Sequence, residues 1–142
     1  MKPLEGFDVQ QTNFDVWDGS VASDFAGGTG TQLDPYLISS ASQLAYLASK
    51  VNTGTNYSGK YFALTVSLDL NFLEWTPIGG NVGSTTRIFH GIFDGYNHTA
   101  ANLYVNVDTN YAGLFGYGGT ISNLNITDAS VTGVNYVGGA AG

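Results

Sequence analysis

The chain has 142 residues and a formal net charge of -7, which excludes nucleic acids and anionic membrane surfaces as partners because both need a basic footprint. It has no cysteine, which excludes disulfides and thiolate metal sites, and no apolar run that approaches the roughly 20 residues needed for membrane insertion. Twenty glycines and few charged residues favour short strands joined by tight turns.

Residues 1–26 are polar and aromatic without a clear period, and we interpret them as a separate N-terminal segment. Its aromatic side chains are expected to anchor it to the rest of the protein: Phe7, Phe14, Trp17 and Phe25. A glycine-rich turn at 27–31 follows. Pro35 then holds Asp34 extended, which predicts a short strand over 36–38.

A helix is predicted over residues 41–52. Ser40 and Gln43 have the spacing of a capping box, and an apolar face follows at Leu44, Leu47, Ala48 and Val51. Asn52 and Gly54 end the pattern. Together with the first strand, this helix forms a predicted region over 27–59 that would cover the open end of a stack of strands.

From Lys60 onward the apolar period changes to two, which indicates β-structure over 60–142. The strongest alternation predicts one strand over 62–70. Leu103, Val105 and Val107 repeat the pattern more briefly.

Two internal repeats overlap in the last third of the chain. Residues 99–105 align with 120–126 at an offset of 120 − 99 = 21, and residues 110–113 align with 135–138 at an offset of 135 − 110 = 25. Such a period matches one coil of a β-solenoid and is too short for a propeller blade. The first alignment predicts that Asn102 and Asn123 stack as an amide ladder, with Leu103 and Leu124 inward.

Several segments resemble the GLUG-motif proteins of bacterial surfaces. The clearest is Gly113-Leu114-Phe115-Gly116, supported by Asn135-Tyr136-Val137-Gly138-Gly139, Phe93-Asp94-Gly95 and Trp75-Thr76-Pro77-Ile78-Gly79. The resemblance covers about residues 27–142, but Ala140 and Ala141 replace the large apolar residues usual in the motif.

This resemblance implies an all-β fold, a right-handed parallel β-helix with one N-terminal capping helix. It also implies a secreted or cell-surface location and an adhesin-like role without a catalytic residue. Because residues 139–142 fall within a repeat, the chain is expected to be truncated there.

No catalytic, cofactor-binding or metal site is assigned. The acids are scattered singly, whereas a glycosidase needs two carboxylates at a defined separation: Asp69, Glu74, Asp94 and Asp108. His90 and His98 lack the supporting ligands of a metal site. Calcium suits the abundant oxygen ligands, but no ligand set is assigned to it.

Six aromatic residues are candidates for stacking on a ligand, with turn filling as the favoured alternative: Tyr57, Tyr61, Trp75, Tyr96, Tyr104 and Tyr111. Three functions stay open. The first is a structural or adhesive module that binds a surface glycan or a protein. The second is a carbohydrate-binding module, and the third is the non-catalytic N-terminal part of a β-helical polysaccharide-degrading enzyme. The nearly uncharged segment 120–142 also predicts end-to-end self-association.

Overall fold

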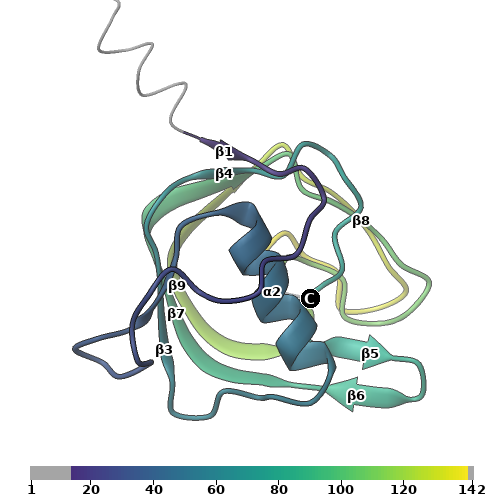
Figure 1. Ribbon diagram of the computed structural model, residues 1–142. Coiled ribbons are helices and arrows are strands. Elements are labelled where there is room, and N and C mark those ends of the chain that lie inside the picture. Colours follow the sequence, from purple (N-terminus) through teal and green to yellow (C-terminus); the bar gives the residue numbers. More distant parts are fainter. Residues whose placement is uncertain (1–13, 141–142) are drawn as a thin grey trace, which may run out of the picture.

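The computed structural model describes residues 14–140, and this part of the chain consists mostly of short strands with one helix, α2 (Ala41–Asn52) (Figure 1). The strands are β1 (Asp15–Val16), β2 (Tyr36–Ile38), β3 (Tyr61–Leu64), β4 (Leu68–Asp69), β5 (Gly80–Val82), β6 (Thr85–Arg87), β7 (Phe89–Ala101), β8 (Tyr104–Asn106), β9 (Gly118–Thr127) and β10 (Ser130–Thr132). The expected all-β class is confirmed for these residues. Within them, no helix is long and apolar enough to cross a membrane.

The long strand β7 organises the main sheet. Its first half pairs with β3 and its second half with β4, while β9 lies along its other side, and all of these pairs are parallel. β2 and β1 extend the sheet beyond β3 and β4, again in parallel. In Figure 1 these strands overlap along one side and the top of the molecule. The hairpin of β5 and β6 is antiparallel.

The predicted strand over 62–70 is wrong in one respect, because it is two strands, β3 and β4, separated by residues 65–67. The alternation holds in part: Phe62, Leu64, Leu68 and Leu70 are buried as expected, but Ala63 is buried too and Val66 is only half-buried. The side chains keep facing inward while the backbone bends. A period of two therefore records which face is buried but not where the strand turns a corner.

The register corrects the offset of 21 residues. The structure pairs Phe93 with Ile121, Thr99 with Asn125 and Val105 with Val131, which are 28, 26 and 26 residues apart. The offset of 25 is confirmed, because Ala112 forms a parallel bridge with Val137. The shorter alignment superimposed two similar local turns that do not lie above one another.

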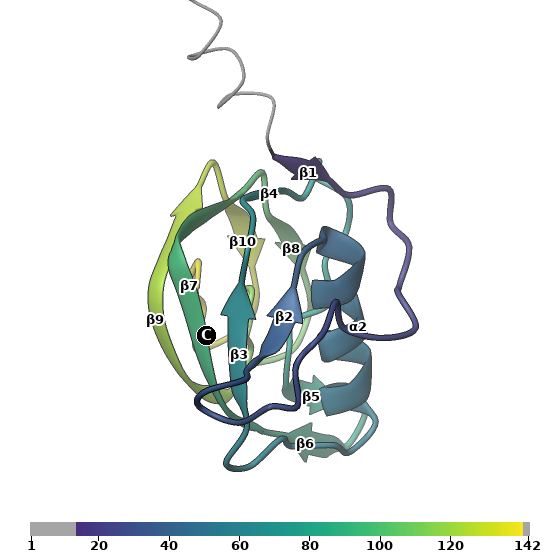
Figure 2. The same cartoon turned by 60° about the vertical axis from the view of Figure 1, so that its left-hand side comes forward.

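The helix was predicted correctly, with the same bounds and the same cap. The Gln43 N–H donates to the Ser40 hydroxyl at 3.2 Å, and the Gln43 side-chain oxygen accepts from the Ser39 N–H at 2.7 Å. The Asp15 carboxylate, on β1, accepts from the Ala41 N–H at 2.8 Å. Figure 2 shows α2 beside β1 and β2, with β9 on the opposite side of the molecule. The helix thus covers one end of the stacked strands.

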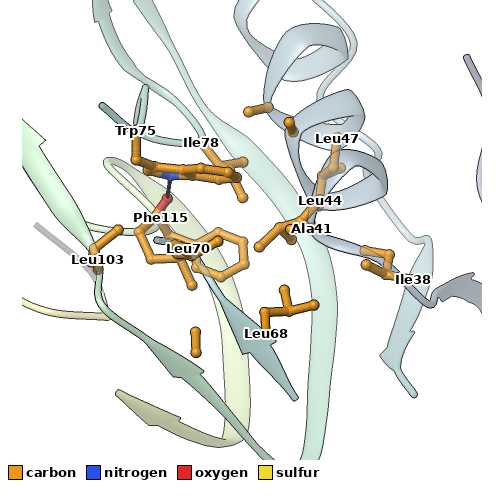
Figure 3. Close-up of a cluster of buried hydrophobic side chains, with 14 of the residues drawn as sticks. Ile38, Ala41, Leu44, Leu47, Leu68, Leu70, Trp75, Ile78, Leu103 and Phe115 are labelled. Atoms are coloured by element: carbon orange, nitrogen blue, oxygen red, sulfur yellow. Dashed lines mark hydrogen bonds between the residues drawn. The ribbon is translucent and has the colours of Figure 1, made fainter. Parts of the chain in front are cut away.

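The core runs between the helix and the strands (Figure 3). Trp75 lies within it and is only 2% exposed, with its indole N–H donated to the Leu114 carbonyl at 3.0 Å. The ring of Trp17 meets it edge-on at 5.2 Å, so the segment that precedes β2 packs on the same core. Of the four predicted anchors, Phe7 lies outside the described residues.

Candidate functional site

A groove of about 410 Å³ crosses the outer face of the main sheet. Its walls come from the loop before β2 and from β3, β7 and β9, so it crosses four neighbouring segments rather than following one strand. The lining residues are Gln32, Leu33, Pro35, Tyr61, Phe62, Ile92, Asp94, Tyr96 and Ser122. Two of the predicted ligand-stacking residues, Tyr61 and Tyr96, thus meet in one concave surface.

Strand pairing explains why these side chains converge. Tyr61 lies opposite Ile92, and Asp94 lies opposite Ser122, in parallel register. Phe93, between Ile92 and Asp94, is fully buried, so alternation turns its two neighbours toward the outer face. The strands therefore place aromatic and polar side chains from distant parts of the sequence side by side.

The carboxylate of Asp94, one of the lining residues, builds a corner of the chain beside the groove. One of its oxygens accepts from the Tyr96 N–H at 2.8 Å and from the side-chain amide of Asn123 at 3.0 Å. Tyr96 has a φ of 50°, and its side chain is 58% exposed. Asp94 thus fixes an unfavourable backbone conformation that holds the Tyr96 side chain outward.

The same corner occurs a second time, at Asp69. One oxygen of that carboxylate accepts from the Asn71 N–H and from the side-chain amide of Asn102, both at 2.8 Å. Asn102 and Asn123 have φ values of 60° and 55°. Asn102 therefore bonds an aspartate of β4, and Asn123 bonds an aspartate of β7.

The predicted ladder between Asn102 and Asn123 is consequently wrong. Leu103 is buried as expected, whereas Leu124 is only half-buried. The sequence signal that was missed is an aspartate two residues before a turn, with an asparagine 33 or 29 residues later. Without the register, that asparagine cannot be assigned to its aspartate.

The remaining aromatic candidates lie away from the groove. Trp75 is in the core and only its edge reaches a separate pocket beside Trp17 and Glu74. Tyr57 packs edge-on against Phe62 at 5.1 Å, and burial raises the pKa of its phenol to about 12, with Tyr46, Tyr36 and Asp24 adding smaller effects. Tyr104 is a half-buried residue of β8.

Tyr111 lies between two other tyrosine rings. Its centroid is 4.6 Å from that of Tyr117 and 5.0 Å from that of Tyr136, with interplanar angles of 10° and 9°. Both faces of Tyr111 are covered, so it cannot stack on a ligand as predicted. Next to this stack, the Asn135 amide donates to the Asn110 side-chain oxygen at 3.2 Å. The amide ladder expected at one repeat is thus found at the other.

The acidic and histidine candidates stay apart from one another. Glu74 and Asp108 are exposed, and Asp69 and Asp94 are committed to their corners. His90 is exposed, and its backbone N–H donates to the Asn56 carbonyl at 2.8 Å. Between residues 14 and 140, no three His, Asp or Glu side chains gather as a metal site would need.

Comparison with known proteins gives two relatives. A protein named "Putative Gly-rich membrane protein", from Evansella cellulosilytica, is 34% identical over an alignment of 116 residues, which covers 78% of this chain and 13% of that protein. Halomucin from Haloquadratum walsbyi is 33% identical over an alignment of 135 residues, which covers 88% of this chain and 1% of that protein. The chain spans only a small part of both relatives, and no family model and no solved structure matches it.

Proposed function

We propose that this chain is a right-handed β-solenoid module, a structural and adhesive segment of a larger secreted or cell-surface protein. The observation that carries the proposal is the parallel register repeated around the molecule. Residues on β7, on β8 and at Ala112 pair with residues 28, 26 and 25 positions later. A chain that returns to the same place at such a spacing builds coils, and parallel crossovers are right-handed in about 98% of cases.

Three further observations support the assignment. The helix α2 covers the end formed by β1 and β2, as solenoid caps do. The names of both relatives point to proteins at or outside the membrane, and the GLUG-like segments agree with that location. Tyr136 stacks on Tyr111 and Asn135 bonds Asn110, each 25 residues apart, and such contacts could be extended along a longer protein.

Adding one coil tests the architecture. A copy of residues 112–136, inserted after residue 136, should fold as an extra layer because each coil contacts only its neighbours. We expect small-angle scattering to show a molecule longer by about 4.8 Å, the spacing of adjacent strands, and circular dichroism to show the corresponding gain in β-structure. A scrambled insert of the same composition is the control. Unfolding of the extended chain, or an unchanged length, would contradict the proposal.

Location is tested in cells that produce the parent protein. Antibodies raised against this chain should label intact cells or precipitate the protein from the culture medium. A cytoplasmic protein serves as the control for leakage. Signal that emerges only after lysis would overturn the surface assignment.

A further inference from the structure

We propose that the groove across β3, β7 and β9 binds a short segment of an uncharged, linear oligosaccharide, with the rings of Tyr61 and Tyr96 against its sugars. The inference rests on the adhesive part of the proposed function and names its ligand. It stands on the shape of the groove, its chemistry and the way its walls are held.

The direction of the groove sets the shape of the ligand. It passes from Gln32 and Leu33 over Tyr61 and Asp94 to Ser122, and so crosses three spacings between neighbouring segments. At about 4.8 Å per spacing, this path is about 14 Å long. A linear chain of sugar units matches such a path better than a single ring does.

The lining sets the chemistry of the ligand. Tyr61, Tyr96, Leu33 and Ile92 offer apolar surface, while the side chains of Gln32, Asp94 and Ser122 offer hydrogen-bonding groups. This combination fits a molecule with apolar C–H faces and a hydroxyl periphery. The groove is lined by no Lys or Arg and has one carboxylate, so an anionic polymer would be repelled.

Asp94 has a free acceptor for such a hydroxyl. The oxygen that bonds Tyr96 and Asn123 is fully engaged, and no residue of the described chain bonds the second oxygen. A carboxylate oxygen that lines an aromatic groove is a strong acceptor for a sugar hydroxyl. The same side chain thus shapes the corner and can contact the ligand.

The rim of the groove is formed before binding. Leu33 is 98% exposed, although its loop is held by several hydrogen bonds. Among them, the backbone N–H groups of Thr29 and Gly30 donate to the Asp34 carbonyl at 3.0 and 2.9 Å, and the Thr29 hydroxyl donates to the Asp34 carboxylate at 3.0 Å. Because the backbone of this loop is already ordered, the exposed Leu33 side chain is available to a ligand without further ordering of the loop.

Binding can be separated from folding with three variants. Tyr96→Asn removes the ring but keeps a residue that tolerates positive φ, and Leu33→Ser changes a side chain that is not buried. Tyr104→Ala is the control, because Tyr104 lies outside the groove. The probes are cello-, xylo-, manno- and malto-pentaose, measured by calorimetry and by amide shifts of residues 92–96 and 122.

We expect the wild-type chain to bind at least one of these pentaoses. Tyr96→Asn and Leu33→Ser should weaken that binding about tenfold or more with unchanged melting temperature, and Tyr104→Ala should leave it intact. No binding to any pentaose, or binding that survives both groove variants, would overturn the inference. So would tighter binding of polygalacturonate. If no pentaose binds, the proposed solenoid fold is unaffected, because the insertion of one coil tests it separately.

Discussion

Ten residues other than glycine adopt positive φ in the described part of the chain, and for several of them hydrogen bonds or ring contacts of the side chain accompany this conformation. Five of them are Asn or Asp, which tolerate this conformation best: Asn71, Asn97, Asn102, Asn123 and Asp128. Four are tyrosines, and two of these, Tyr111 and Tyr136, stack their rings. Tyr111 and Tyr136 therefore both turn the backbone and form contacts between side chains.

Two replacements of Asn102 separate the contribution of its hydrogen bond to Asp69 from that of its positive-φ backbone conformation. Asn102→Gly keeps the backbone conformation but loses the 2.8 Å bond to Asp69, and should lower the free energy of unfolding by about 1–2 kcal/mol. Asn102→Ala loses the bond and adds the cost of positive φ, so we expect about 2–4 kcal/mol. Urea denaturation measures both. An equal loss in the two variants would show that the backbone conformation contributes nothing.

The raised pKa of Tyr57 leads us to predict that the folded protein loses stability at alkaline pH. Its phenol has a pKa raised from 10.0 to about 12 in the folded protein, so the folded state keeps the proton that the unfolded state releases. The stabilisation is complete below pH 10 and disappears as the pH rises toward 12. Thermal melting across this range should therefore show a steeper decline for the wild type than for Tyr57→Phe. Identical slopes would contradict the prediction.

At the scale of elements, the helix could be predicted from the sequence and the corners could not. The signals for α2 are all local: Ser40 and Gln43 mark its start, and the apolar spacing follows within three turns. The corner between Asp94 and Asn123 joins residues 29 positions apart, and only the register of β7 and β9 brings them together. Tyr61 and Tyr96 were candidates from their residue type, but their meeting in one groove also depends on that register.

The cap on α2 links the helix to β1. Asp15→Ala removes the acceptor of the Ala41 N–H and should cost about 0.5–2 kcal/mol. Asp15→Asn keeps an oxygen acceptor at the same place and should recover part of the loss. Because β1 precedes Trp17, whose ring meets Trp75, tryptophan fluorescence reports whether this segment stays docked. Unchanged stability in both variants would mean that the Ser40 cap is sufficient.

At the scale of the whole molecule, the two ends of the stack differ. The end beside β1 and β2 is covered by α2, whereas among the described residues β9 pairs with β7 alone. Near that edge, Val134, Tyr136 and Val137 are exposed, and Asp128 is the one charged residue in 118–140. An apolar strand edge with so little charge favours pairing with another strand.

We therefore expect end-to-end association through residues 120–140; the last two residues of the predicted 120–142 segment lie outside the described part of the chain. Sedimentation should show concentration-dependent dimers. The variant Val134→Lys with Val137→Lys should shift the equilibrium to monomer without changing the melting temperature, because both side chains are exposed. The control carries lysines at Thr53 and Ser58, which are exposed and lie far along the sequence. A strict monomer at every concentration would contradict the expectation.

The parallel pairing also bears on how the strands would separate if the chain were pulled along the direction in which they stack. Hydrogen bonds between β3, β7 and β9 point along the direction in which the strands stack. A pull along that direction loads them one after another, as a zipper does, and not all at once in shear. Each strand then separates at low force and releases slack before the next one is loaded. A protein built from many such layers would lengthen gradually under drag and refold, layer by layer, when the drag ceases.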